Sequence, residues 1–303
     1  MRADVVVVWG GGRGIGRAVA VELARRGTTV AIVARSADQV ADAAAEASAE
    51  GGQATAHVAD ATRAGDVEGV VEEVCRLHGR IDATVVAAGS NGPVGPAWTI
   101  APHEWAETLR ANTIVAFNVC RFVVPKMIPH RRGKIVLFGG GGSTAPVPML
   151  SAYGAAKAAI ARFAETLAVE TAEHGLQVNV VAPGLVDTTI HEGVVAAGGG
   201  AHGRRVAEAR ATGIGFVPAA LAADLVAFLV SSASGRLTGK LISAAHDDWR
   251  SWGERDAELN ALPLYTVRRV DAHTVLPLVP ALEAAVSGTA TATASAVGRP
   301  SER

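Results

Sequence analysis

Short apolar runs rich in β-branched residues alternate with helix-like segments along most of the chain, and this alternation constrains the fold most strongly. The first cycle reads DVVVVWG at residues 4–10, GIGRAVAVELARRG at 14–27 and TTVAIVAR at 28–35. The rhythm continues to a sixth apolar run, QVNVVAPG, at 177–184. Runs that are apolar almost throughout are typical of strands buried on both faces. The pattern therefore predicts an α/β fold with a parallel sheet covered by helices on both faces.

Length, charge and cysteine content narrow the class of protein. With 303 residues, of which 49% are hydrophobic, the chain can form one large α/β domain or two smaller ones. A formal net charge of -1 gives no overall basic surface, so no nucleic-acid partner is expected. Cys75 and Cys120 are too few for a disulfide framework and fit a reducing cytoplasm. No apolar run reaches the roughly 18 residues of a membrane span or resembles a signal peptide, so we expect a cytoplasmic protein without a membrane partner.

The turn between the first strand and the first helix, GGGRGIG at residues 10–16, has the pattern of a dinucleotide-binding loop. Gly10, Gly14 and Gly16 permit a tight turn and allow a pyrophosphate to approach the helix N-terminus. The strand before the turn and the helix after it supply the context that a glycine pattern alone lacks. The alternative is a glycine-rich loop that binds no ligand.

The end of the second strand predicts which dinucleotide binds. NAD sites place an acid there for the ribose hydroxyls, whereas NADP sites need positive charge for the 2′-phosphate. Arg35 stands at that place, and Arg13 in the glycine turn adds a second guanidinium, which suits a phosphate. We therefore expect NADP(H), unless both arginines are only solvated surface residues. Asp60, which ends the third strand, is either a contact to the adenine amino group or a helix cap.

From about Val5 to about Trp249 the chain resembles the short-chain dehydrogenase/reductase family. The matching segments are GGGRGIG, VARS, AAG at 87–89, LRANTIVAFNV, YGAAK, NVVAPGLVDTT and RLTGKLISAAHDDW. The resemblance implies a doubly wound, Rossmann-like parallel sheet of about seven strands, a nicotinamide cofactor, a small-molecule substrate and a homodimer or homotetramer. The cofactor contacts that it implies are Gly10, Gly12, Arg13, Gly14, Ile15, Gly16, Arg35, Asp60, Ala61, Ala88, Gly89, Asn112, Tyr153, Lys157, Pro183, Gly184, Val186 and Thr188.

Tyr153 and Lys157 are the candidate catalytic pair. Their spacing of four residues places both side chains on one helix face. A neighbouring ammonium and the positive charge of nicotinamide favour the phenolate, so we expect a phenol pKa below its usual value of about 10. The resemblance implies that Tyr153 protonates the carbonyl oxygen as hydride reaches the carbon, and that Lys157 holds the nicotinamide ribose. It also implies that Asn112 bends its long helix and holds a water that links Lys157 to solvent.

The serine that helps to hold the substrate oxygen in the family has no counterpart at its usual place. Thirteen residues before Tyr153 stands Gly140, and Gly139 precedes it. The nearest hydroxyls belong to Ser143 and Thr144. We take Ser143 as the candidate substitute because a glycine-rich turn is pliable. The alternatives are a water or a backbone N–H in this role, with Ser143 as an ordinary loop residue.

Two further positions depart from the family pattern. Trp9 stands where a threonine usually precedes the first glycine, and Val86 and Ala87 replace two asparagines in the fourth strand. We expect the neighbouring strands to be repacked with apolar contacts at these positions.

The expected domain spans residues 1–249 and includes a glycine-containing substrate lid at about 188–215. Residues 250–285 are an extension that packs over the substrate side or against a second subunit. Residues 286–303 contain mainly small and polar residues and are expected to be disordered.

Four charged or titratable residues in the expected lid are candidates for contact with a polar or anionic substrate: His191, His202, Arg204 and Arg205. The alternative is that most of them are solvated. The histidines have no spacing typical of a metal site, so no metal is expected.

Two functions remain open. One is an NADPH-dependent reductase of a small carbonyl compound, such as a ketone or keto-sugar, with Tyr153 as proton donor. The other keeps the fold but catalyses a non-redox step, as a cyclase or isomerase does, or only binds a dinucleotide. Asn112, Tyr153 and Lys157 favour the first function, whereas Gly139 and Gly140 favour the second.

Overall fold

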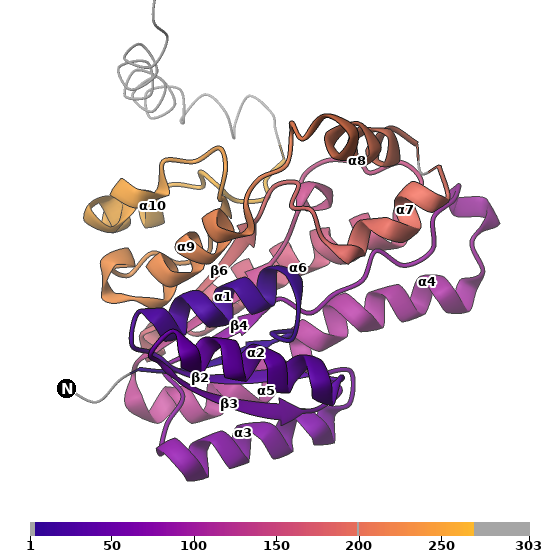
Figure 1. Ribbon diagram of the computed structural model, residues 1–303. Helices are drawn as coiled ribbons and strands as arrows, with labels where there is room; N and C mark the ends of the chain where they lie inside the picture. The colour runs from indigo at the N-terminus through magenta and orange to yellow at the C-terminus, as the bar shows by residue number, and fades with distance from the viewer. Residues whose placement is uncertain (1–3, 199, 270–303) are drawn as a thin grey trace, which may run out of the picture.

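A computed structural model describes residues 4–198 and 200–269 of the chain (Figure 1). The strands are β1 (Val5–Trp9), β2 (Thr29–Ala34), β3 (Gln53–Val58), β4 (Ala83–Val86), β5 (Gly133–Phe138), β6 (Leu176–Ala182) and β7 (Leu241–Ser243). The α-helices are α1 (Gly14–Arg25), α2 (Ala37–Ala49), α3 (Ala64–His78), α4 (Pro102–Leu109), α5 (Val115–Met127), α6 (Ser151–Glu170), α7 (Glu192–Ala196), α8 (Gly200–Thr212), α9 (Ala219–Val230) and α10 (Asp256–Ala261). The predicted tail at 286–303 lies outside the described residues.

The described strands form one sheet in the order β3-β2-β1-β4-β5-β6-β7. Every neighbouring pair is parallel. This confirms the predicted doubly wound, Rossmann-like sheet with seven strands. The strand order reverses between β1 and β4, and such a reversal leaves a crevice at the carboxyl ends of the strands where ligands bind.

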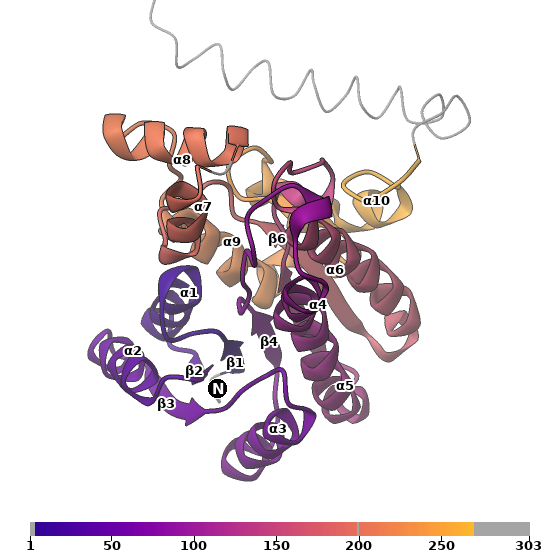
Figure 2. The same cartoon turned by 90° about the vertical axis from the view of Figure 1, so that its right-hand side faces the viewer.

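Side chains from both faces of the sheet are buried, as the apolar runs predict. Val6 and Val8 of β1 belong to a core with α1, α2 and α9. Val5, Val7 and Trp9 belong to a second core with α3, α5 and α6. Figure 2 shows α1 and α2 on one side of the sheet and α5 and α6 on the other. The period of two along β1 thus supplies both cores at once.

The helix caps and breaks follow partly from local sequence. Ser36 caps α2, because its side chain accepts a hydrogen bond from the backbone N–H of Gln39 at 3.4 Å. The predicted long helix after β4 is present, and it consists of α4 and α5 joined by a π-helical turn at Arg110–Ile114. Such a turn inserts one residue into the helical ladder and often marks a functional site.

Within the described residues, the stretch 102–130 is long and apolar enough to cross a membrane by length and composition, with a mean hydropathy of 1.2. It was not expected from the sequence as a span, and 44% of its most apolar window is buried. Val119 and Val123 of this stretch are fully buried in the core with β1. Packing against the sheet therefore accounts for its apolar side.

The chain beyond β7 continues the core as far as α10. Trp249 and Trp252, in a 3-10 segment at Trp249–Arg255, are each 3% exposed. The Trp249 ring lies 5.5 Å from that of Phe228 in α9, between ring centroids. Leu259 in α10 belongs to the same core. The first part of the predicted extension therefore packs with the sheet domain, and its part from residue 270 lies outside the described residues.

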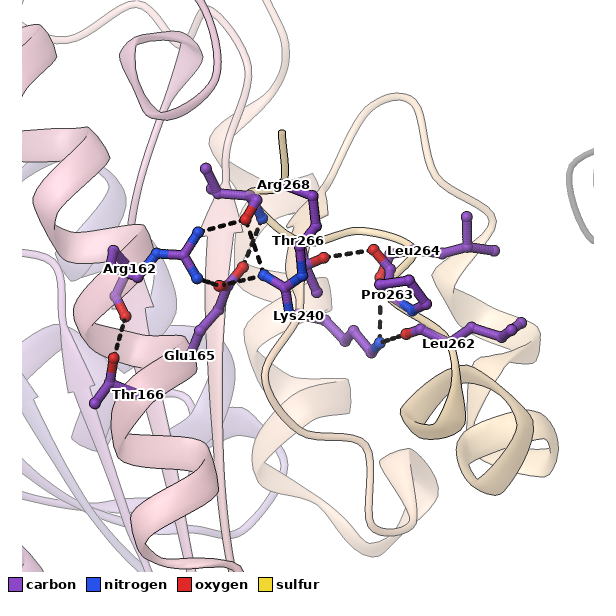
Figure 3. A network of polar contacts seen from close by, with 10 residues as sticks. Arg162, Glu165, Thr166, Lys240, Leu262, Pro263, Leu264, Thr266 and Arg268 are labelled. Atoms are coloured by element: carbon purple, nitrogen blue, oxygen red, sulfur yellow. Dashed lines mark hydrogen bonds and ion pairs between the residues drawn. The ribbon is translucent and has the colours of Figure 1, made fainter. Parts of the chain in front are cut away.

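Residues 262–268 lie along the edge strand β7 and against α6 (Figure 3). The Lys240 ammonium donates to the carbonyls of Leu262 at 2.7 Å and Leu264 at 3.1 Å. The Leu241 N–H donates to the Tyr265 carbonyl at 2.7 Å. Glu165 of α6 accepts from the Arg268 guanidinium at 2.8 Å. This segment covers the edge of β7, a position where unpaired backbone groups would otherwise invite another strand.

Candidate active site

The glycine turn packs so closely, on itself and on the loop after β4, that two of its positions exclude a side chain. A Cβ atom on Gly10 would lie 2.6 Å from the backbone nitrogen of Ala88, and the φ of Gly10 is +81°. A Cβ atom on Gly16 would lie 2.2 Å from the Gly10 carbonyl oxygen. Gly10 also donates its N–H to the Val33 carbonyl at 2.8 Å, which fixes the turn to β2. This cradle at the start of α1 fits the predicted approach of a pyrophosphate.

A cavity of about 390 Å³ lies at this turn. Many of its lining residues are ones that the sequence predicts as cofactor contacts: Gly10, Gly12, Arg13, Gly14, Ile15, Gly16, Arg35, Asp60, Ala61, Ala88, Gly89 and Thr188. Six predicted contacts do not line it, namely Asn112, Tyr153, Lys157, Pro183, Gly184 and Val186. Residues that the sequence reasoning missed include Ser36, Gln39, Thr62, Ser90, Thr189 and Ile190. Ser36 directly follows Arg35 and Gln39 lies four residues after it, so the strand end could have indicated them.

Two arginines and one aspartate give this cavity its charge. The side chains of Arg13 and Arg35 are exposed at the cavity and form no hydrogen bond or ion pair within the described residues. Burial raises the pKa of Asp60, but hydrogen bonds from the Thr62 N–H and hydroxyl, with the charges of Arg35 and Arg63, outweigh it and lower that pKa. Asp60 therefore supports the turn before α3 with one oxygen, Oδ1, which accepts both Thr62 bonds.

Tyr153 and Lys157 face each other on α6, next to the end of β5. The Lys157 ammonium lies 5.6 Å from the centroid of the Tyr153 ring and donates to the Phe138 carbonyl at 2.9 Å. Lys157 is 5% exposed, and burial lowers its pKa to about 8. At neutral pH this side chain still carries its proton, because the pH lies below that pKa.

The pKa of Tyr153 differs from the expectation. Burial raises it to about 12, whereas the neighbouring ammonium was expected to lower it. Burial in a low-dielectric environment disfavours the phenolate, and here it outweighs an ammonium placed over the ring. In the protein alone the phenol is therefore a neutral donor, and only the additional positive charge of a bound nicotinamide remains to lower its pKa.

Asn112 lies in the π-helical turn and is fully buried. Its amide group donates to the carbonyls of Ser90 and Thr108, both at 2.8 Å. Its Oδ1 has no hydrogen-bond partner within the described residues. A Cβ atom on Gly89 would lie 2.7 Å from this oxygen and 3.5 Å from the Lys157 nitrogen, so Gly89 leaves both polar atoms facing the same space. An unpaired buried oxygen beside an ammonium fits the water that the family resemblance implies.

Gly140 brings the Tyr153 phenol against the backbone. Its φ is +156° and its ψ is -175°, a region that essentially only glycine occupies. A Cβ atom there would lie 2.9 Å from the phenol oxygen. The space that a serine side chain would need at this position is therefore taken by Tyr153.

The Ser143 hydroxyl forms no hydrogen bond with Tyr153 within the described residues. It is 3% exposed, and its hydroxyl donates to the backbone carbonyl of Lys157 at 3.1 Å. This bond ties the glycine turn after β5 to the helix that carries the candidate catalytic pair. The geometry favours a positioning role for Ser143, and its direct contact with substrate stays a prediction.

Trp9 replaces a small polar residue with a buried aromatic one. It is fully buried, and its indole N–H donates to the Thr84 hydroxyl at 3.1 Å. Val86 is 3% exposed in the neighbouring strand β4. The strands are thus packed by apolar contacts at these positions, as expected, with one hydrogen bond that satisfies the indole.

The predicted lid contains a 3-10 turn at Thr189–His191 followed by α7 and α8, which lie together at one end of the molecule (Figure 1). The rings of His191 and His202 are tilted, with centroids 5.4 Å apart. Asp187 pairs with Arg210 at 2.9 Å. The predicted lid contacts Arg204 and Arg205 are exposed on α8. No cluster of three or more metal-binding side chains occurs within the described ranges.

The all-parallel sheet and the cavity at its switch point define a Rossmann-type, dinucleotide-binding class of protein. The family model for short chain dehydrogenase matches residues 4–197, and the chain belongs to this family. Its similarity to dehydrogenases and reductases supports an oxidoreductase that uses a nicotinamide dinucleotide and a small-molecule substrate.

Two curated relatives and two solved structures illustrate this similarity. A 2,3-dihydro-2,3-dihydroxybenzoate dehydrogenase of Bacillus subtilis is 31% identical over 243 residues, which cover 78% of this chain and 93% of the relative. A hydroxynaphthalene reductase of Aspergillus fumigatus is 36% identical over 187 residues, covering 60% and 66%. An NAD+-bound xylitol dehydrogenase has a TM-score of 0.73 and 29% identity, covering 79% and 96%. A levodione reductase has a TM-score of 0.74 and 26% identity, covering 84% and 99%.

Proposed function

We propose that the protein is an NADP(H)-dependent oxidoreductase that reduces the carbonyl group of a small ketone or keto-sugar-like compound. The observation that carries the choice of cofactor is the pair Arg13 and Arg35. Both line the cavity, and neither guanidinium is used by another described residue. The position after β2 thus offers positive charge instead of the acid that would hold the ribose hydroxyls of NAD.

The chain's own residues would divide the chemistry as follows. Tyr153 donates its proton to the carbonyl oxygen of the substrate. Lys157 keeps an ammonium beside the ring, and Asn112 offers its unpaired oxygen to a water that can resupply the proton. The nicotinamide cofactor, when bound, supplies the hydride. A positioned general acid of this kind contributes roughly a hundred- to ten-thousandfold to the rate.

The cofactor assignment is tested by titrating the unmodified protein with NADPH and NADH. We expect tighter binding of NADPH, and we expect Arg35→Asp to weaken it by on the order of 2 kcal/mol, because a charged hydrogen-bond partner is replaced by a repelling one. Arg63→Asp is the matched control, since Arg63 is an exposed arginine nearby that does not line the cavity. Equal dissociation constants for the two dinucleotides in the unmodified protein would contradict the assignment.

A non-redox reaction is the second candidate, and the glycine turn favours it. Gly140 has no side chain, and the nearest buried hydroxyl, that of Ser143, is bound to the Lys157 carbonyl. Tyr153→Phe should abolish carbonyl reduction while NADPH stays bound, but a cyclase or isomerase could also need the phenol. The absorbance of NADPH during turnover separates the two. Product that accumulates while NADPH is neither consumed nor formed, with no bound cofactor changing its redox state, would exclude the reductase.

We further propose a cytoplasmic homodimer or homotetramer. An apolar side of α5 supports the association. Ile114, at the end of the π-helical turn before α5, is 40% exposed, and Phe117 in α5 is 49% exposed. The Phe117 ring lies 6.3 Å from that of Phe163 in α6. Exposed apolar side chains that cluster in this way are typical of interfaces.

A further inference from the structure

Within the described residues, a single side-chain hydrogen bond links the lid to a distant part of the chain. The Asn91 amide group donates to the Ile190 carbonyl at 2.7 Å, between residues that lie 99 positions apart in the sequence. Asn91 is 7% exposed. Among the described residues, no other hydrogen bond or ion pair joins lid residues 188–212 to the chain outside 185–217. Thr188 lies near the glycine turn without a hydrogen bond to it in the described part of the chain, since a Cβ atom on Gly14 would lie 3.4 Å from the Thr188 side chain.

The loop that carries Asn91 is itself firmly held. The Gly92 N–H donates to the Ser90 hydroxyl at 3.1 Å, and a Cβ atom on Gly92 would overlap the side chain of Thr108 in α4. Asn112 donates to the Ser90 carbonyl at 2.8 Å. Asn91 therefore projects from a fixed loop toward a lid that has few other polar attachments.

The two bonds form a continuous path from the lid to the candidate catalytic site. Asn112 is bonded to Ser90, and the next residue, Asn91, is bonded to Ile190. Ser90 and Ile190 both line the proposed dinucleotide cavity. Closure of the lid and the orientation of the Asn112 side chain thus share one loop.

We propose that Asn91 is a positioning residue, a latch that holds the lid closed over the cofactor cavity and couples its closure to Asn112. This inference rests on the proposed function, because it takes the cavity to be the site of the dinucleotide. Without the amide donor, the Ile190 carbonyl must find water, which it does when the lid is open. Loss of the donor should therefore favour the open lid, and the bound cofactor should leave faster.

Hydrogen exchange of the full chain without cofactor tests the latch independently of activity. Asn91→Ala removes the donor, and Asn91→Asp keeps the shape while facing the Ile190 carbonyl with a carboxylate. We expect exchange of backbone amides in 188–212 to rise by about three- to tenfold in both variants, the range expected for one hydrogen bond. Asn260→Ala is the control, because the Asn260 amide donates to the Arg236 carbonyl at 2.8 Å, away from the cavity.

The rate of NADPH dissociation, followed by its fluorescence, gives the second readout. We expect it to rise by a similar factor in both Asn91 variants, with a smaller change in the association rate. Lid exchange that stays unchanged in the Asn91 variants, or that rises equally in Asn260→Ala, would overturn the proposal. If the unmodified protein does not bind NADPH, the proposed cofactor is wrong, whereas the exchange measurement still decides on the latch. If Asn91→Ala fails to fold, the isosteric Asn91→Asp variant carries the test.

Discussion

Tyr153 and Lys157 have pKa values that burial moves in opposite directions, toward about 12 and about 8. Burial favours the uncharged form of each group, which is the acid for a phenol and the base for an amine. At neutral pH the pair is therefore a neutral phenol, which can donate its proton, beside a protonated ammonium. The phenol still needs further positive charge before its proton is easily lost.

This state of Tyr153 can be read by ultraviolet titration of tyrosinate, because the chain has only two tyrosines. Burial also raises the pKa of the other one, Tyr265. A raised folded pKa contributes stability below the ordinary value near 10, and that stability is lost as the pH rises through the folded value. We therefore expect almost no tyrosinate at pH 10 in folded Tyr265→Phe, where Tyr153 is the one remaining tyrosine. NADP+ should shift the Tyr153 transition downward, whereas substantial ionisation by pH 10 without cofactor would contradict the burial argument.

Gly140 is the residue whose replacement tests the altered site most directly. Gly140→Ser should not restore the family arrangement, because the backbone there is nearly glycine-only and the new Cβ would meet the Tyr153 phenol at 2.9 Å. We expect a loss of about 1–3 kcal/mol in the free energy of unfolding, measured with denaturant, and slower turnover. Gly141→Ser is the control, since a Cβ there meets nothing within 4 Å. A Gly140→Ser variant with unchanged stability and faster turnover would show that the turn can refold around a hydroxyl.

At the scale of elements, the π-helical turn and the lid determine how the site is assembled. The turn at Arg110–Ile114 lets the Asn112 amide donate to the Thr108 carbonyl, which a regular helix would satisfy with a backbone N–H, and also to the Ser90 carbonyl in the loop after β4. The lid contributes two histidines whose pKa values are both lowered. Burial and the charges of His202 and Arg210 lower the pKa of His191, and they outweigh a backbone hydrogen bond with Val186 and the charge of Asp187, which raise it. Burial and the charge of Arg205 lower the pKa of His202.

The lowered pKa values predict that the lid loosens in acid. A base whose folded pKa is depressed stays neutral in the closed lid but takes up a proton in the open one. The closed lid therefore has its full stability above the ordinary histidine value of 6.5 and loses it as the pH falls toward the lowered values. We expect amide exchange in 188–212, corrected for the intrinsic effect of pH, to be faster at pH 5 than at pH 7. The double variant His191→Asn with His202→Asn should lose this difference, and a difference of equal size there would refute the explanation.

In the molecule as a whole, one potential contact surface is covered by the chain itself and another is not. The edge of β7 is covered by residues 262–268, which are bonded to Lys240 and Glu165 (Figure 3). The side of α5 with Ile114 and Phe117 is uncovered. An association of subunits is therefore expected to use the α5 surface.

Phe117→Glu should reduce the mass of the particle in solution, measured by light scattering after size-exclusion chromatography. A carboxylate at the centre of an apolar contact must be desolvated on association without a partner. Leu77→Glu, on α3, is the control, because Leu77 has a similar exposure of 46% on a different helix. A monomeric unmodified protein, or an equal effect of both substitutions, would argue against an interface at α5.

Features that are encoded over a few neighbouring residues could be predicted without the structure. The apolar runs indicated the parallel sheet, GGGRGIG indicated the turn, and the spacing of Tyr153 and Lys157 placed both on one helix face, because strand and helix periods are local. The family motifs likewise identified the oxidoreductase class. The cap at Ser36 was predictable for the same reason.

The directions and surroundings of the polar groups in the site depend instead on the packing of distant segments. The Ser143 hydroxyl turns to the Lys157 carbonyl, and the phenol occupies the space above Gly140, because φ and ψ in the turn are set by the packing of β5 against α6. The raised pKa of Tyr153 sums the burial contributed by segments far apart in the chain. The bond from Asn91 to Ile190 joins residues 99 positions apart, and no local pattern records it. Such contacts depend on the complete arrangement of the elements, which a single sequence read by local periodicity does not contain.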